Sequence, residues 1–127
     1  MPVPRDRRYS RTHEWHQPSD GVVTVGITKF AADELTDITY VDLPSPGTPV
    51  KAGERFGEVE SVKATSELYS GVTGRIIEVN ANLFGAPELV NSDPFGAGWM
   101  VRIAMDNPAE LEALLSPEEY EKLIGQA

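Results

Sequence analysis

The sequence feature that most constrains the fold is a series of short β-branched segments, interrupted by glycine and proline, between residues 22 and 80. Residues 22–27 and 38–43 are rich in Val, Ile, Thr and Tyr, which favour strands. Further strands are predicted at residues 56–62, 65–69, 75–80 and 98–103, with turns at Gly47, Gly53, Gly71 and Gly74. Strands this short, with a turn every few residues, predict a mainly β chain folded as a small barrel or sandwich.

Length and composition limit the chemistry that the chain can support. The 127 residues suit one compact domain, 1–127. Because cysteine is absent, disulfides, thiolate metal ligands and a cysteine nucleophile are excluded. A metal site or a Ser-His-Asp triad would have to use the two histidines, His13 and His16. We predict neither a metal site nor a catalytic residue.

The charge balance and the hydropathy indicate where the protein acts. Its net charge is −9, with 20 acidic and 11 basic residues. Nucleic acid is therefore not an expected partner, since phosphate contacts need a basic surface, whereas basic patches on other proteins are expected partners. No apolar run approaches the roughly 20 residues that span a bilayer. Four arginines occur by Arg11 without the apolar core of a signal peptide, so we expect a cytoplasmic protein.

Helices are expected only around the edge of the β structure. The Thr28 hydroxyl can cap a short helix over residues 29–35. Residues 107–125 are predicted to be helical, because Asn107 precedes a proline and Ser116 begins a capping box. Residues 1–20 are polar and are expected to form an arm that leads into the domain, and one helical turn is expected at residues 87–91.

The segment most informative about function is a predicted hairpin over about residues 56–70. If Lys63 and Ala64 are the central residues of a two-residue turn, residues of the same type face one another across it: Val62 with Thr65, Ser61 with Ser66, Glu60 with Glu67, and Val59 with Leu68. This turn lacks the glycine or asparagine that such turns favour, and it places two carboxylates opposite each other. Local rules broken together often mark a functional site, although an ordinary exposed loop lysine accounts equally well for the spacing.

A lysine at the tip of a hairpin has two chemical uses. As a nucleophilic amine it would need burial or a nearby cation to lower its pKa. Its expected neighbours are acidic and favour the charged form. Attachment of an acyl cofactor is the other use, since amide formation removes the charge and leaves a long arm.

The motif Glu60-Ser61-Val62-Lys63-Ala64, followed by Ser66-Glu67-Leu68-Tyr69, resembles the lipoyl-lysine hairpin of the glycine cleavage system H-protein family. Biotin carriers have methionines on both sides of their lysine, which Val62 and Ala64 do not match. Lipoyl domains of the pyruvate dehydrogenase type lack the His13-Glu14-Trp15 segment and this C-terminal helix. Other segments that resemble the family are Tyr9-Ser10, Val25-Gly26-Ile27-Thr28, Tyr40-Val41-Asp42-Leu43-Pro44, Val79-Asn80, Pro87-Glu88-Leu89-Val90-Asn91 and Gly98-Trp99.

The resemblance implies a flattened β-barrel of two sheets, a barrel-sandwich hybrid, with short peripheral helices. It also implies a carrier and not an enzyme, with lipoic acid amide-linked to Lys63. Lipoate-attaching enzymes would recognise the hairpin through residues around that lysine: Glu60, Ser61, Val62, Ala64 and Glu67. The arm would receive an aminomethyl group from glycine decarboxylase (P protein), pass it on at the aminomethyltransferase (T protein), and be reoxidised by dihydrolipoamide dehydrogenase (L protein). One tethered carrier thus serves three active sites at high effective concentration. One alternative is an H-like protein that mainly relays lipoyl groups to other complexes. Another is a structural domain with an unmodified hairpin that only binds partners.

The resemblance further implies a cleft in which the loaded arm rests, at Thr12, Glu14, Glu67 and Ser70. A carboxylate such as Glu14 suits a cationic amine, and excluding water protects a labile linkage. The chain departs from the family at Lys29-Phe30, where an acidic residue and a histidine are common. Phe30 is expected to cover the arm in place of that histidine. Gly71 replaces a frequent proline and is expected to loosen the end of the hairpin.

Overall fold

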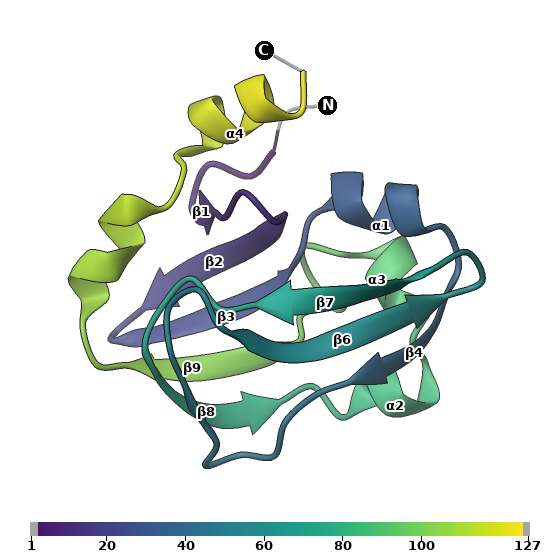
Figure 1. Cartoon of the computed structure of the whole chain (residues 1–127), viewed down its shortest axis with the longest axis horizontal. Coiled ribbons are helices and arrows are strands. Elements are labelled where there is room, and N and C mark those ends of the chain that lie inside the picture. The colour runs from purple at the N-terminus through teal and green to yellow at the C-terminus, as the bar shows by residue number, and fades with distance from the viewer. Residues whose placement is uncertain (1–2, 126–127) are drawn as a thin grey trace.

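The computed structural model describes residues 3–125, which form two antiparallel β-sheets with short helices at their edges (Figure 1). The larger sheet has the strand order β1-β2-β3-β9-β8-β5, and the smaller has the order β4-β6-β7. The strands are β1 (Arg8–Tyr9), β2 (Glu14–Ser19), β3 (Val22–Ile27), β4 (Ile38–Asp42), β5 (Pro49–Val50), β6 (Arg55–Ser61), β7 (Thr65–Tyr69), β8 (Gly74–Val79) and β9 (Val101–Met105). This confirms the prediction of a mainly β, sandwich-like barrel with short peripheral helices.

The helices are short and begin where the sequence places capping residues. The elements are α1 (Lys29–Leu35), α2 (Asn82–Gly85), α3 (Leu89–Ser92), the 3₁₀ helix η1 (Pro108–Ala113) and α4 (Pro117–Leu123). Thr28 accepts from the N–H of Ala31 at the start of α1, and Ser116 forms the predicted capping box with Glu119. The predicted helical segment 107–125 thus contains two helices, the 3₁₀ helix η1 and α4, and residues 114–116 between them are extended. In residues 3–125 no helix has the length and apolar character required to cross a membrane.

The main core lies between the two sheets. Alternate residues of β3, such as Val23 and Val25, point inward and are fully buried, as the period-2 pattern of a strand requires. Val59 of β6 and Leu68 of β7 reach the same core from the smaller sheet. Each such side chain stabilises the fold by about 1.5–3 kcal/mol relative to an exposed one.

The N-terminal segment belongs to the larger sheet, so the prediction of a polar arm over residues 1–20 was wrong for the described part. β2 pairs with β3 along its whole length, from Glu14 opposite Ile27 to Ser19 opposite Val22. Trp15 is the anchor: its indole N–H donates to the carbonyls of Ile27 and Pro94, at 3.0 and 2.9 Å. A second, smaller core cluster of Val3, Tyr9, Trp15 and Tyr120 joins these strands to α4.

The start of the last strand also differs from the prediction. It begins at Val101 and not at residue 98, because Gly98 packs against the backbone of α3 and of Asp93, which follows α3. Residues 1–2 and 126–127, which the predicted domain 1–127 includes, lie outside the described residues.

Candidate functional site

Lys63 lies at the tip of the β6–β7 hairpin, beside the loop between α1 and β4 (Figure 1). The turn is closed by a hydrogen bond from the N–H of Ser61 to the carbonyl of Ala64, 2.8 Å long, so Val62 and Lys63 are its central residues. The Ser61 hydroxyl also accepts from the N–H groups of Lys63 and Ala64, at 3.1 and 2.9 Å. Side-chain hydrogen bonds of this kind stabilise a tight turn that has no glycine or asparagine.

The predicted register of the hairpin was wrong. Glu60 pairs with Thr65 and not with Glu67, because the turn is centred one residue earlier than predicted. This change moves each residue opposite a partner two positions away, so every side chain keeps its face of the sheet. Val59 and Leu68 face the core in both registers, so the burial of these two residues does not distinguish the registers. The hydrogen bonds that the Ser61 hydroxyl accepts from Lys63 and Ala64 fix the position of the turn.

The facing carboxylates are consequently Glu58 and Glu67, well below the tip. Arg55 offsets their repulsion, with Nη2 2.5 Å from Glu58 Oε1 and Nε 3.3 Å from Glu67 Oε2. Among the described residues no carboxylate pairs with Lys63, whose Nζ donates to the carbonyl of Glu34 at 3.2 Å. The predicted placement of Lys63 above a pair of carboxylates, Glu60 and Glu67, was therefore wrong.

The other predicted hairpin residues divide between the tip and the strands. Val62 is 69% exposed and its N–H donates to the carbonyl of Asp37 at 3.0 Å, which ties the tip to the α1–β4 loop. Ala64 is exposed beside Lys63, and Glu60 is half-buried one pair below. Glu67 is exposed, four residues from Lys63 along β7. The tip thus presents a lysine between two exposed apolar residues.

Glu14 is the centre of the predicted cleft. It is 1% exposed, and its Oε1 accepts from the hydroxyls of Ser10, at 2.5 Å, and Thr12. Its Oε2 accepts from the backbone N–H of Tyr69 in β7, at 3.2 Å. Burial raises the pKa of Glu14 to about 7, and the hydrogen bonds from Ser10 and Thr12 work against that rise.

The structure brings only some of the predicted cleft residues into contact. Thr12 touches Glu14, whereas the Ser70 hydroxyl is buried and is bonded to Val72, donating to its carbonyl at 2.6 Å. Glu67 lies on the outer surface, where its carboxylate accepts from the hydroxyl of Tyr69 at 3.4 Å. Ser10 and the Tyr69 amide also bind Glu14, and neither was predicted from the sequence. The spacing of two hydroxyls before the glutamate was the available signal for Ser10.

His13, between Thr12 and Glu14, contacts two aromatic side chains, those of Phe30 and Tyr120. The His13 ring lies 5.0 Å from the Phe30 ring, and its Nδ1 is 2.8 Å from the hydroxyl of Tyr120 in α4. The same hydroxyl is 2.8 Å from Oγ1 of Thr28, the cap of α1. His13 has a φ of 76°, and burial lowers its pKa from the usual value. Phe30 therefore stands next to the segment that carries Thr12 and Glu14.

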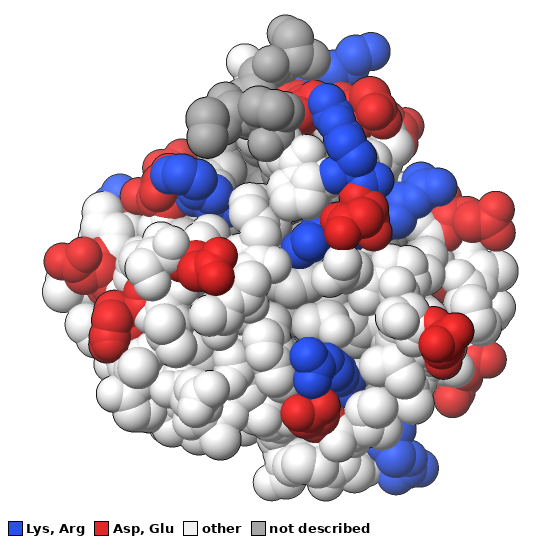
Figure 2. Space-filling view, turned by 180° about the vertical axis from the view of Figure 1, so that it is seen from behind, with Lys and Arg blue, Asp and Glu red and all other residues white. Residues whose placement is uncertain are grey.

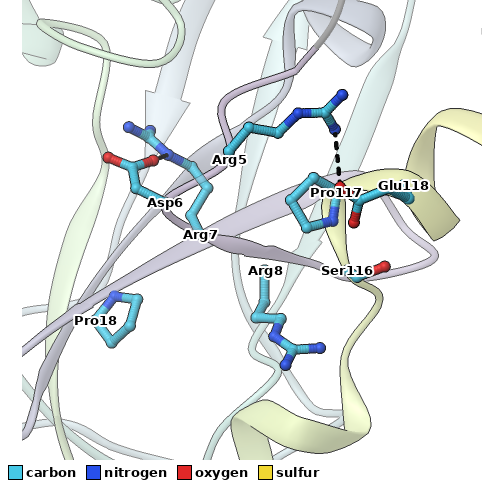
Figure 3. Close-up of a pocket in the computed structure, with 8 residues that line it drawn as sticks. All are labelled: Arg5, Asp6, Arg7, Arg8, Pro18, Ser116, Pro117 and Glu118. Carbon is cyan, nitrogen blue, oxygen red and sulfur yellow. Dashed lines mark hydrogen bonds and ion pairs between the residues drawn. The ribbon is translucent and has the colours of Figure 1, made fainter.

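A separate cavity of about 440 Å³ lies between the N-terminal segment and α4, and Figure 3 shows the residues that line it. Its arginines are largely paired with carboxylates: Arg5 reaches Glu118 and Arg7 folds back onto Asp6. On the face shown in Figure 2 most Lys and Arg side chains likewise lie close to Asp or Glu. The part of the chain that is described holds no group of three metal-ligating side chains.

Known proteins are similar to this chain in sequence and in fold. A family model described as glycine cleavage H-protein matches residues 7–127. The chain is 50% identical over 124 residues to the glycine cleavage system H protein of Carboxydothermus hydrogenoformans, which covers 98% of this chain and 95% of that one. It is 52% identical over 123 residues to the probable glycine cleavage system H protein of Natronomonas pharaonis, covering 97% of each. The crystal structure of a glycine cleavage system H protein from Mycobacterium marinum superposes with a TM-score of 0.89 at 40% identity, over 97% of this chain and 99% of that one.

These similarities first define a class, that of the carrier proteins. Within it, the chain belongs to the glycine cleavage H-protein family, and its role is that of a lipoyl shuttle in the glycine cleavage system. The resemblance drawn from the hairpin motif is confirmed. The protein therefore works together with the other proteins of that system.

Proposed function

We propose that Lys63 carries the lipoyl group through an amide to its Nζ. The observation that supports this is the turn itself, which fixes Lys63 at an exposed tip through Ser61 while leaving Nζ with one weak carbonyl contact. An attaching enzyme can reach that amine without unfolding any part of the sheet. Ser61, Val62 and Ala64 supply the shape and the apolar surface that such an enzyme would recognise, with Glu60 and Glu67 farther down the strands.

The dimensions of the hairpin fit such an arm. From Cα of the lysine to its disulfide ring a lipoyl-lysine has about eleven bonds, or roughly 13 Å when extended. From Lys63 to Tyr69 the hairpin runs for six residue steps, or roughly 20 Å at about 3.3 Å per residue. An arm that folds back along β7 therefore brings its ring to about Glu67, and the carried group extends from there toward the Tyr69 amide, which donates to Glu14.

We infer that Glu14, with Thr12, holds the amine end of the carried group in this cleft. The carboxylate has no cationic partner among the described residues, so a bound amine would supply one. Its burial excludes water, which protects a labile linkage. Phe30 and His13 form the apolar side of the cleft, and Ser70 and Glu67 act from β7 and the segment after it.

The partners follow from the chemistry of the bound group, which accepts an aminomethyl unit and is afterwards reoxidised. We propose the P protein (glycine decarboxylase), the T protein (aminomethyltransferase), the L protein (dihydrolipoamide dehydrogenase) and a lipoate-attaching enzyme as partners. This chain contributes no catalytic residue in the proposal and acts as a substrate of those enzymes. A cytoplasmic location belongs to the same proposal, and cell fractionation tests it.

The first experiment measures intact mass after incubation with a lipoate ligase. The chain has four lysines, Lys29, Lys51, Lys63 and Lys122, so the attachment site can be assigned by substitution. We expect a gain of one lipoyl group that Lys63→Arg abolishes and that Lys51→Arg, at another exposed turn lysine, leaves unchanged. A gain that survives Lys63→Arg would refute the attachment site. Modified protein that fails to support glycine–bicarbonate exchange by the decarboxylase would instead indicate a relay of lipoyl groups.

A further inference from the structure

The turn between β1 and β2 wraps tightly around one side chain, that of Glu14. Ser10 is held there by the backbone: its N–H donates to the carbonyl of Glu14 at 2.9 Å, and its carbonyl accepts from the N–H of His13 at 3.1 Å. The Ser10 hydroxyl in turn accepts from the N–H of Glu14 at 3.0 Å and lies 2.5 Å from Oε1 of its carboxylate. Ser10 therefore contacts both ends of the residue that it faces.

The Glu14 carboxylate has one hydrogen-bond acceptor position that no donor fills. An ionised carboxylate offers about four lone-pair positions, two on each oxygen. In Glu14, Oε1 receives the hydroxyls of Ser10 and Thr12, which fill it. Oε2 receives one donor, the N–H of Tyr69. The remaining position is on Oε2, the oxygen that faces β7.

The two hydroxyls on Oε1 are not equivalent. Ser10 is half-buried and is fixed by its backbone bonds, whereas Thr12 is exposed and reaches the carboxylate only through its side chain. The Thr12 side chain can therefore turn toward a group that arrives from solvent without breaking the turn. The Ser10 contact has no such freedom.

We propose that Ser10 is a positioning residue for Glu14, holding its carboxylate so that the open position on Oε2 faces the amine of the carried group. This inference rests on the proposed cleft and adds a residue to it. The Ser10 hydroxyl binds Oε1, and the open position is on Oε2, so Ser10 acts through the carboxylate. Removing its hydroxyl frees Oε1 and lets the side chain rotate, which weakens both the bond to Tyr69 and the bond to an amine.

The test compares Ser10→Ala with Ser10→Thr, which keeps a hydroxyl at the same place. The first measurement needs no arm: ¹³C NMR titration of the Glu14 carboxyl in the unmodified chain, assigned with Glu14→Gln. Because a hydrogen bond to the ionised form is lost, we expect Ser10→Ala to raise the midpoint by about one pH unit, a ~10-fold change in proton affinity. Ser10→Thr should stay close to the wild type. An unchanged midpoint in Ser10→Ala would overturn the proposal, and so would an equal shift in both variants.

The titrations of Tyr120 and His16 do not overlap with that of Glu14. Tyr120 of α4 has its pKa raised to about 12 by burial, and His16 of β2 has its pKa lowered to about 4 by burial. Neither changes charge between pH 5 and 9, roughly the window in which Glu14 titrates. His13, whose pKa also lies below the usual value, is followed separately by its ring signals.

The second measurement is the lifetime of the loaded form against pH. We expect Ser10→Ala to shorten it several-fold at pH 7 and Ser10→Thr to restore it, with the amount of lipoyl group on Lys63 unchanged in both. A lifetime that is unaffected in Ser10→Ala would overturn the positioning role. Failure of the wild type to take up a lipoyl group would refute the proposed attachment and leave the NMR titration to decide the Ser10–Glu14 contact.

Discussion

Replacing Glu14 with glutamine tests how its buried carboxylate changes the free energy of unfolding with pH. Glu14 is 1% exposed and its carboxylate accepts three hydrogen bonds, yet burial raises its pKa from the usual 4.5 to about 7. A glutamine is nearly the same size and can keep its oxygen toward the Tyr69 amide. Its NH₂ would face Ser10 and Thr12, whose hydroxyls can rotate from donating to accepting.

The way in which stability depends on pH follows from the direction of the pKa shift of Glu14. Because the pKa of Glu14 is higher in the folded state, folding is favoured by the protonated form. That contribution is complete below pH 4.5 and is lost as the pH rises through 7. The difference between about 7 and 4.5, at about 1.36 kcal/mol for each unit, corresponds to roughly 3 kcal/mol. Glu14→Gln has no proton to lose, so it should exceed the wild type by up to that amount at pH 8.

The assay is urea unfolding of both proteins at a series of pH values. The difference in free energy of unfolding should be small at pH 4.5, should grow up to about pH 7, and should then stay constant. Glu112→Gln, at an exposed glutamate, is the control and should show no such dependence. His16 titrates in both proteins, so its contribution cancels in the difference. A difference that is constant with pH, or one that favours the wild type at pH 8, would contradict the assignment of a raised pKa.

Three further predictions concern single side chains. His16 is fully buried and its pKa falls to about 4 from 6.5, so its contribution to stability is present above pH 6.5 and is lost as the pH falls through 4. We expect wild-type unfolding to show an acid-side loss of roughly 3 kcal/mol that His16→Gln largely removes. Gly26→Ala should destabilise by about 1–3 kcal/mol in urea unfolding, because its Cβ would lie 2.7 Å from the Trp15 ring. Gly85→Ala, which meets open space, is its neutral control. Ser61→Ala should slow lipoylation of Lys63 in a time course, since two turn amides lose their acceptor, and Ser61→Thr should not.

Elements of the fold were predictable where neighbouring residues decide the structure. The strand at Val22–Ile27 and the helix after Thr28 follow from local propensity and capping, and both match the prediction. β2 was missed because Pro18 and its polar neighbours resemble a loop, while its stability comes from contacts remote in sequence. The bond from Trp15 to Pro94 is one of these, and no local pattern records it.

The hairpin was predictable in its position and not in its register. The sequence motif placed Lys63 in the turn of a hairpin, which the structure has. Two registers that differ by two residues bury the same side chains, so the sequence pattern could not choose between them. The contact between Ser10 and Glu14 depends on a turn that places His13 at a φ of 76°. A positive φ is uncommon for a residue other than glycine, and no local sequence pattern predicts one at His13.

Gly71 shows how a departure from the family pattern is accommodated. The expected proline would have stiffened the end of the hairpin, but it carries no N–H. In this chain the N–H of Gly71 donates to Nε2 of the buried His16 at 3.0 Å, and a Cβ at position 71 would lie 2.8 Å from the Leu114 side chain and 2.9 Å from that nitrogen. Glycine and histidine are therefore coupled, because proline at position 71 would remove the donor and crowd the acceptor. The hydrogen bond joins β2, which carries Glu14, to the segment that follows β7, so it stabilises the contact between the two sides of the proposed cleft that proline would have stiffened from one side alone.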